Sequence, residues 1–284
     1  MFPYLNELDQ FVKHELKARH YVRYVDDFVL LHESPEQLRQ WRDTIENFLR
    51  ERLLLSLKKR SEPFSINEGV DFLGYVVRPH YRLVRRRVVR KLFVKLDAFA
   101  RAHIRGDVLR LPPVARDQLH ATLKSYFAHF HHAHTHKLRQ RAVQQYAWLK
   151  TLYGEDKTTA LIPAWQPRRV TGLVAQYRFF TRRFPDACVL MQVGQSWLTH
   201  GEFAHWLRAH GWGNPVQRPG LGACIEIHHR QRAALHRFLK RRHVTQVWAA
   251  QTGYLKTGFR RRALVAYVCP ENPTSSFSFP RDAS

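Results

Sequence analysis

Cysteine is scarce in this 284-residue chain, which contains only Cys188, Cys224 and Cys269 and no CxxC spacing. Three isolated cysteines argue against a disulfide framework or a zinc site and are typical of a reducing compartment. Long hydrophobic runs are missing as well, because stretches such as ALVAYV are far too short to span a bilayer. The N-terminus shows no charged region followed by an apolar stretch, so no secretory signal is expected. The sequence therefore predicts a cytoplasmic protein without membrane-spanning segments.

Acidic residues are also scarce in this sequence. There are 23 Asp and Glu against 47 Lys and Arg, which gives a formal net charge of +24 and an isoelectric point near 10.6. Residues 1–77 carry a net charge of −2 (11 basic, 13 acidic), whereas residues 78–284 carry +26 (36 basic, 10 acidic). Such a basic region is typical of nucleic-acid binding. An anionic membrane surface is the alternative, but no single amphipathic helix collects the basic residues.

The hydrophobic content of 44% indicates a folded protein, and the length allows two domains. Periodicity predicts helices over residues 5–17 and from Pro35, with Ser34 as the N-cap of the second helix. Proline and the absence of periodicity mark residues 158–171 as a linker. The other expected elements are strands over 20–24, 27–31, 53–60, 70–79, 186–194, 222–228, 245–251 and 261–269, a basic helix from Arg85, a connector over 105–117, helices to about residue 153, and a helix over 228–242.

Two adjacent carboxylates, Asp26 and Asp27, interrupt the apolar stretch RHYVRYVDDFVLLHES (residues 19–34). Burying an unpaired carboxylate is costly or shifts its pKa until the group is neutral. At a tight connection between two strands, at least one of these side chains can reach solvent or a metal. Mg²⁺ prefers oxygen ligands, and nucleotidyl transfer uses two such ions. A metal-binding hairpin and an ordinary β-turn are both open interpretations of YVDD alone.

The segments around this motif occur in a recognisable order. YLNELDQFVKHEL precedes it, and a helix, the basic segment LSLKKR and then DFLGYVV follow it. This order resembles the palm of reverse transcriptases of the bacterial type, which group II introns, retrons and diversity-generating elements encode. The resemblance covers about residues 4–100. It extends more loosely through SYFAHFHHAHTHKLRQRA, which is similar to the helical thumb of that family.

The resemblance implies roles for individual residues. Asp26 and Asp27 would be the catalytic carboxylates and would bind Mg²⁺ or Mn²⁺, with Asp26 the stronger candidate for a direct ligand. Tyr24 would lie against the primer end, and Gly74 would let the primer backbone approach closely. Strand packing for Tyr24 and a β-bulge at Gly74 are the structural alternatives.

The family also uses a further carboxylate, from a strand well upstream of this motif, and finger residues that bind the nucleoside triphosphate. Only 25 residues precede Asp26. Glu7, Asp9 and Glu15 follow a helical pattern, so they are expected to form its solvated face. The chain is therefore expected to correspond to the C-terminal part of a polymerase and to be inactive unless another chain supplies the upstream half.

Basic residues cluster after FLGY, and several fall on one face of the predicted helix, which suits contact with a duplex backbone without sequence reading. His132 and His136 sit four residues apart, but no acidic ligand lies nearby, so phosphate contacts or plain helix surface are favoured over a metal site. The segment Lys58–Arg60 is either a phosphate contact or a solvated strand end. The predicted nucleic-acid contacts are Lys58, Lys59, Arg60, Arg82, Arg85, Arg86, Arg87, Arg90 and Lys91.

A second and less specific resemblance covers about residues 174–270. VAQYRFFTRRFPDACVLMQVGQSW, the later strand–helix–strand segment that closes with Gln-x-Gly, and RRALVAYVCP resemble the N-terminal, mismatch-contacting domain of the MutS DNA-repair family. The Phe-x-Glu wedge of that family falls on Ser196, Trp197 and Leu198, so neither the Phe nor the Glu is present. Trp197 could stack on a base, but packing in the core is the favoured interpretation. The expected duplex-binding residues are Arg230, Arg232, Arg237, Lys240, Arg241 and Arg242, with Trp197 as a further candidate.

Together these patterns predict an α/β (α+β) protein whose function is that of an RNA-directed DNA polymerase homologue. It would bind an RNA template and RNA/DNA duplex, and Mg²⁺ only if another chain completes the site. A non-catalytic nucleic-acid-binding protein derived from a retroelement is the alternative. The expected domains are a partial palm (1–103), a thumb-like block (104–157), a linker (158–171), a MutS-like domain (172–270) and a disordered tail (271–284).

Overall fold

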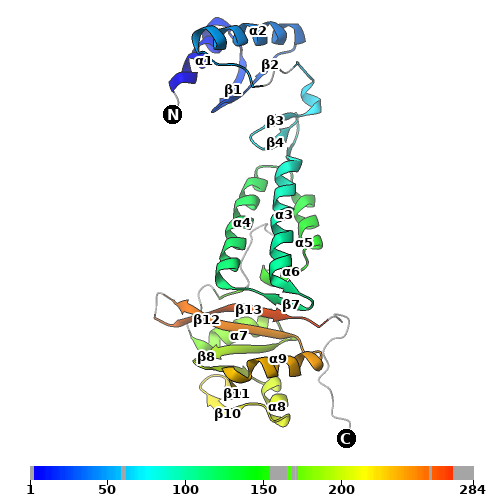
Figure 1. Ribbon diagram of the computed structural model, residues 1–284, viewed down its shortest axis with the longest axis vertical. Helices are drawn as coiled ribbons and strands as arrows, with labels where there is room; N and C mark the ends of the chain where they lie inside the picture. The colour runs from blue at the N-terminus through cyan, green and yellow to red at the C-terminus, as the bar shows by residue number, and fades with distance from the viewer. Residues whose placement is uncertain are drawn as a thin grey trace. The chain divides into compact units, whose positions relative to one another are not determined.

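The computed structural model describes residues 3–58, 62–153, 165–167, 170, 172–255 and 258–270 (Figure 1). Helices and strands are both abundant, which confirms the general α/β class. The chain divides into two compact units. The N-terminal unit contains residues 1–88 and 132–134, and the C-terminal unit contains residues 89–131 and 135–284. No helix among the described residues is long and apolar enough to cross a bilayer.

The N-terminal unit starts with a helical stretch that confirms the predicted helix over 5–17. It comprises η1 (Pro3–Leu5), α1 (Asn6–Gln10) and η2 (Phe11–Glu15), the last wound as a π-helix. Strands β1 (His20–Tyr24) and β2 (Asp27–Leu31) form where predicted and pair antiparallel in a sheet of their own. α2 (Pro35–Arg52) begins at the predicted cap, because the Ser34 Oγ accepts a hydrogen bond from the Gln37 N–H at 3.3 Å.

One apolar core joins these elements. Leu8 and Val12 from the first helical stretch pack with Ile45 and Leu49 from α2, and all four are buried. Their spacing puts them on one face of each helix. Burying a side chain of this kind contributes about 1.5–3 kcal/mol. The strands pack on the same core through Tyr21, Phe28 and Leu30.

The predicted strand over residues 53–60 is wrong for the described residues of that segment. Leu53 is buried against the α2 core, whereas Leu54 is exposed and has a φ of +53°. The regular alternation of a half-buried strand is therefore absent, and no neighbouring strand pairs with this segment. Lys59 and Arg60 lie outside the described residues.

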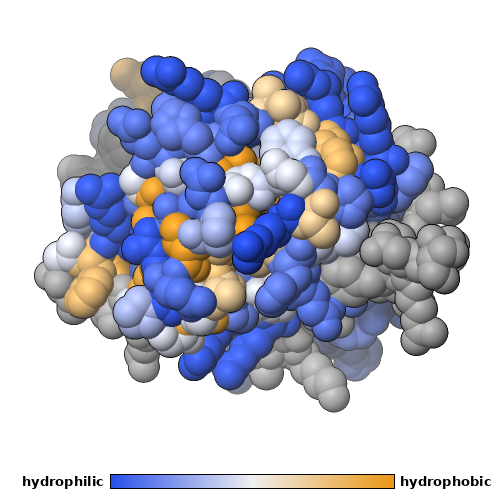
Figure 2. Space-filling model, turned by 90° about the horizontal axis from the view of Figure 1, so that it is seen from below, coloured by the Kyte–Doolittle hydropathy of each residue, from blue (hydrophilic) through white to orange (hydrophobic). Residues whose placement is uncertain are grey.

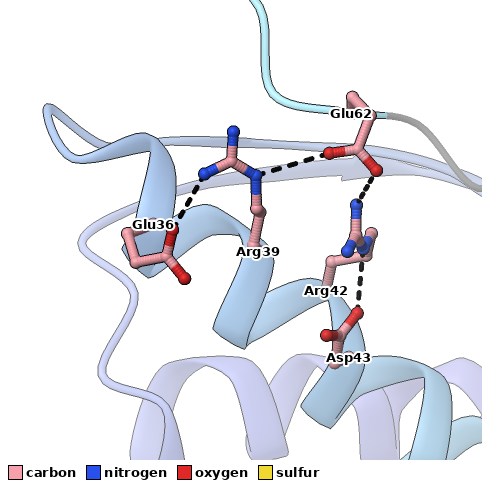
Figure 3. A network of polar contacts seen from close by, with 5 residues as sticks. All are labelled: Glu36, Arg39, Arg42, Asp43 and Glu62. Carbon is pink, nitrogen blue, oxygen red and sulfur yellow. Dashed lines mark hydrogen bonds and ion pairs between the residues drawn. The ribbon is translucent and has the colours of Figure 1, made fainter.

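An ionic network holds the chain against α2 just beyond this segment (Figure 3). The Glu62 carboxylate contacts the Arg39 Nε at 3.5 Å and the Arg42 guanidinium at 2.6 Å. Glu36 and Asp43 of the helix pair with the same two arginines at 2.8 and 2.9 Å. Exposed ion pairs contribute little individually, but here they fix where the chain runs after the helix.

The predicted single strand over 70–79 is instead a hairpin. β3 (Val70–Phe72) and β4 (Tyr75–Val77) pair antiparallel and meet at Leu73 and Gly74, whose φ values are +51° and +85°. Two consecutive positive φ values are the signature of a type I′ turn, for which glycine is well suited. Gly74 is therefore a turn residue and not a bulge. β5 (Arg82–Val84) adds a third strand.

The helices of the C-terminal unit confirm the predicted helical block. They are α3 (Arg86–His103, whose first turn lies in the N-terminal unit), α4 (Pro113–His131), α5 (His136–Gln145) and α6 (Trp148–Leu152). The Tyr146 hydroxyl donates to Asp97 at 2.6 Å, and the Trp148 ring stacks on Phe99 at 5.1 Å. Leu92 and Leu96 form the buried face of α3.

The predicted connector over 105–117 is in part a pair of strands. β6 (Ile104–Arg105) and β7 (Val108–Arg110) form a hairpin, and β7 pairs with β13 (Arg260–Val268) of the C-terminal region. Leu109 and Leu111 are buried beside it. Because this pairing joins segments far apart in sequence, the helical block and the following α/β region form one compact unit.

The sheet of this unit has eight strands in the order β10-β11-β9-β8-β12-β13-β7-β6. All of its pairings are antiparallel except β8 with β12. The predicted strands over 186–194, 222–228, 245–251 and 261–269 are confirmed, whereas β9, α8 and β10 were not predicted. The remaining elements are α7 (Leu173–Arg183), β8 (Cys188–Val193), β9 (Ser196–His200), α8 (Glu202–Ala209), β10 (Asn214–Arg218), β11 (Gly222–His228), η4 (His229–Gln231), α9 (Arg232–Arg241) and β12 (Gln246–Tyr254).

Only a few residues of the predicted linker are described. Trp165 is buried, and its carbonyl oxygen accepts a hydrogen bond from the Leu264 N–H at 2.7 Å. Its ring packs edge-on against His120 and Tyr153. This part of the segment is therefore packed onto the C-terminal unit. The predicted tail over 271–284 lies outside the described residues.

Candidate functional site

The two carboxylates lie at the tip of the β1–β2 hairpin. Tyr24 pairs with Asp27, and Val25 and Asp26 form the two-residue connection. Val25 has a φ of +58° and Asp26 does not have a positive φ, a combination found in type II′ turns. All four residues are exposed. Within the described part of the chain, Asp26 and Asp27 have no hydrogen-bond or ion-pair partner, so their oxygens are available to a cation.

Arg23 connects this turn to the first helical stretch. Its Nε and a terminal nitrogen donate to the two carboxylate oxygens of Asp9 at 2.7 and 2.5 Å. Its other terminal nitrogen donates to the carbonyl oxygen of Val25 at 2.7 Å. The prediction that Asp9 belongs to a solvated helix face is wrong, because its side chain is only 20% exposed and is paired in this bidentate way. Sequence spacing gives no signal for this pairing.

Electrostatics keep the pair charged. The hydrogen bond from Arg23 holds the pKa of Asp9 below its usual value, and the same bond raises the pKa of the Arg23 guanidinium. The Tyr21 hydroxyl also donates to Asp9, at 2.8 Å, and burial together with that bond raises the pKa of Tyr21. The hairpin tip is therefore held by a bridge that is ionised at neutral pH.

The donor set of the tip fits a single hard cation. Asp26 and Asp27 offer carboxylate oxygens, which suit Mg²⁺ or Mn²⁺ with water completing the coordination. Among the described residues, however, no group of three or more His, Cys, Asp and Glu side chains is placed to hold a metal ion. The tip thus supplies part of the ligand set that two-metal chemistry requires.

The residues expected to hold the primer are distributed over separate elements. Tyr24 lies on the hairpin and is 59% exposed, so it is not a packed strand residue. Gly74 lies in the β3–β4 turn, and the β1–β2 and β3–β5 sheets are not joined into one sheet. Lys58 is exposed after α2. The structure therefore contains the two hairpin elements but no single palm sheet among its described residues.

The basic cluster lies on β5 and at the start of α3. Most residues of this cluster are exposed. Arg85 is the exception, because it is half-buried and donates to Asp71 at 2.7 Å. The buried face of α3 is apolar, which leaves its charged residues facing solvent. His134 accepts from the Arg82 N–H at 3.3 Å and packs edge-on against Tyr81, so it has a structural role. The exposed members of the cluster are Arg82, Arg86, Arg87, Arg90 and Lys91.

Trp197 is not available for base stacking in the C-terminal unit. Its side chain is 4% exposed, and its ring packs edge-on against Trp248 with centroids 4.9 Å apart. The Arg232 guanidinium covers both rings, at 5.1 and 5.0 Å from their centroids. Because the indole is buried under this cation, the favoured interpretation of core packing is confirmed, and Trp197 is corrected as a candidate for duplex contact.

The basic residues of α9 and η4 divide into two groups. Lys240 forms an ion pair with Asp107 at 2.6 Å, so it ties the helix to the β6–β7 turn. Burial, followed by the charge of Arg110, lowers the pKa of Arg232. The others are exposed and have no acidic partner among the described residues: Arg230, Arg237, Arg241 and Arg242.

The same unit has a shallow pocket of about 140 Å³ between α8 and strands β10 and β11. Figure 2 views the C-terminal unit from the side on which these elements lie, and shows a small hydrophobic group among mainly hydrophilic side chains. Burial raises the pKa of the Cys224 thiol, which disfavours a thiolate nucleophile. The lining residues are Ala204, His205, Arg208, Pro215, Val216, Gln217, Ala223, Cys224 and Ile225.

Two comparisons of the sequence with known proteins give no match. No protein-family model matches the sequence, and no curated protein matches it significantly. The chain's own residues and the resemblance of its motifs are therefore the basis for its proposed function.

Proposed function

We propose that this chain is a reverse transcriptase homologue that binds template–primer and does not polymerise by itself. The observation that carries the proposal is the YVDD hairpin, in which Asp26 and Asp27 are exposed at a turn held by the Arg23–Asp9 bridge. A rigid turn with two free carboxylates is suited to a divalent cation. Such an ion would supply charge neutralisation at the attacking and leaving oxygens of nucleotidyl transfer.

The chain's own residues would position the nucleic acid. The exposed arginines at the start of α3, with Lys91, would contact backbone phosphates without reading sequence. Tyr24 would place its ring beside the primer end. The net charge of +26 after residue 77 supports a polyanionic ligand.

Polymerisation requires more ligands than the hairpin offers. The described residues place no third potential metal ligand at the tip. We propose that a second polypeptide contributes the further carboxylate and the residues that bind the nucleoside triphosphate. The alternative is a non-catalytic nucleic-acid-binding protein in which the hairpin is a relic, and the exposed basic residues favour it equally.

Primer extension separates these functions. The chain is incubated with an RNA template, a DNA primer, deoxynucleotides and Mg²⁺ or Mn²⁺, with and without a reverse transcriptase fragment that carries fingers and the first carboxylate strand. We expect binding without extension by the chain alone, and extension in the mixture. Extension by the isolated chain would contradict the proposed incompleteness.

The matched control is the double variant Asp26→Asn, Asp27→Asn. We expect it to bind primer–template as the wild type does and to give no extension in any mixture. If no mixture extends the primer while the wild type binds it tightly, the non-catalytic alternative holds.

A further inference from the structure

The β12–β13 hairpin continues beyond the sheet that holds its base (Figure 1). β12 pairs with β8 only over Gln246–Ala249, and β13 pairs with β7 only over Ala266–Val268. The two strands go on pairing with each other as far as Tyr254 and Arg260. This outer part of the hairpin, residues 250–254 and 260–265, is called the ribbon. It has no further strand neighbour among the described residues.

Two glutamines hold the ribbon in place. On one edge, the Gln176 side chain of α7 accepts from the Arg262 N–H and donates to the Arg260 carbonyl oxygen, both at 3.0 Å. These are the bonds that a neighbouring strand would make. On the other edge, the Gln192 Oε1 accepts from the Gln251 N–H at 3.0 Å. The ribbon is therefore a preorganised support.

The end of the ribbon carries two exposed aromatic rings. Tyr254 is 66% exposed and Phe259 is 53% exposed, and no other Phe, Tyr or Trp of the described C-terminal unit is exposed to this degree. Tyr254 pairs with Arg260, and the Leu255 N–H donates to the Phe259 carbonyl oxygen at 2.8 Å. Tyr254 is the last residue of β12 and Phe259 directly precedes β13, so both rings lie at the end of the ribbon where the chain turns.

The surroundings of the rings are basic. The exposed Arg260 and the half-buried Arg261 follow Phe259, and the sequence from residue 227 to residue 270 contains no Asp or Glu. The Arg260 guanidinium donates to the Gln251 side chain at 2.7 Å, which orients it along the ribbon. A polyanion that offers flat apolar faces is the complement of such a tip, and unpaired bases on a phosphate backbone have both properties.

We propose that Tyr254, Phe259, Arg260 and Arg261 form a binding site for single-stranded nucleic acid. Each ring stacks on one unpaired base, and the arginines contact the flanking phosphates. A duplex hides its base faces, so it is a weaker ligand for this site. The proposal goes beyond the proposed function and does not depend on the YVDD hairpin.

Fluorescence anisotropy of the full chain with a labelled oligonucleotide of about 16 nucleotides tests this site. We expect Tyr254→Ala and Phe259→Ala each to weaken single-strand binding about tenfold, the range measured for lost base stacking. Tyr254→Trp retains a stacking ring and should bind as the wild type does. Arg260→Gln should reduce the slope of log affinity against log salt by about 0.7.

Phe64→Ala is the matched control, because Phe64 is an exposed aromatic residue of the N-terminal unit. It should not change single-strand binding. Thermal unfolding of every variant excludes loss of folding, which is not expected at exposed positions.

Three results would overturn the site. The first is unchanged single-strand binding by the double variant Tyr254→Ala, Phe259→Ala. The second is an equal loss of duplex and single-strand binding by that variant. The third is a variant that binds oligonucleotides as the wild type does but loses binding to anionic phosphatidylserine vesicles. Failure of the proposed function is distinguishable, because it would leave primer extension absent in every mixture and leave the ring-dependent single-strand binding intact.

Discussion

The β1–β2 hairpin and the β12–β13 ribbon both present functional side chains at the tip of two paired strands, but those of the first are acidic and those of the second are basic and aromatic. Each presents side chains on a pair of strands that has no strand neighbour at its tip among the described residues. Each is fixed by a side chain from a helical segment, Asp9 through Arg23 in the first and Gln176 in the second. The first presents carboxylates and the second presents arginines and rings. From this comparison we infer that the contacts of Asp9 with Arg23 and of Gln176 with β13 hold each tip more than the strand pairing does.

Replacing the support of the ribbon should have the largest effect. Gln176 is 1% exposed, and Gln176→Ala leaves the Arg262 N–H and the Arg260 carbonyl oxygen without this partner. We expect a loss of about 3 kcal/mol in unfolding free energy. Denaturant unfolding measures it, and Gln195→Ala, at an exposed position, should change stability by less than about 0.5 kcal/mol. Equal losses of stability in Gln176→Ala and Gln195→Ala would show that Gln176 does not hold the ribbon.

Replacing the support of the hairpin should have a smaller effect, because the Arg23–Asp9 pair is partly exposed. Arg23→Ala should cost about 2 kcal/mol and speed amide exchange at Val25 and Asp26. Arg39→Ala removes a more exposed pair with Glu36 and should cost less than about 0.5 kcal/mol. Hydrogen exchange followed by mass spectrometry compares the two variants. Equal exchange at the turn in both would show that Arg23 does not hold it.

The turn residue itself offers a change of opposite sign. Val25 is β-branched and has a φ of +58°, a conformation that glycine adopts at less cost. Val25→Gly should therefore stabilise the protein by up to about 1 kcal/mol, less the greater chain entropy of glycine. Thermal unfolding checks the sign. A marked loss of stability would mean that the Val25 side chain has a role beyond the turn.

The smallest expected effect is the contribution of the Asp9 carboxylate to the pH dependence of the unfolding free energy. Arg23 lowers the pKa of Asp9 in the folded state, so this carboxylate stabilises the fold above its unfolded pKa of about 3.9. That contribution disappears as the pH falls through the lower, folded-state pKa. The stability difference between the wild type and Asp9→Asn should therefore be constant near neutral pH and shrink below about pH 4. Denaturant unfolding at several pH values measures it, and a constant difference down to pH 2 would contradict the bridge.

Local patterns of sequence were sufficient for much of the fold. Ser34 and Pro35 predict the start of α2, and the alternation of HYVRY and DFVLL predicts β1 and β2. The predicted strand over 53–60 was wrong because an apolar run does not show whether a partner strand exists. The β7–β13 pairing was missed because it joins residues more than 150 positions apart.

The candidate site was predictable only in part. The YVDD motif places Asp26 and Asp27 at a hairpin tip, as the structure has them. Asp9 was missed because a helix pattern shows which face is polar but not which partner approaches it. Trp197 was a candidate because it falls on the wedge position of the MutS resemblance, and its packing against Trp248 and Arg232 excludes base stacking.

The central claim is that the YVDD tip binds a divalent cation. Paramagnetic broadening of backbone amide signals by substoichiometric Mn²⁺ tests it most directly. The account predicts broadening centred on residues 24–28 when the wild type is mixed with an upstream fragment that supplies the further carboxylate, and its loss in the same mixture with the double variant Asp26→Asn, Asp27→Asn. Broadening elsewhere, or broadening at the tip that the double variant retains, would contradict it.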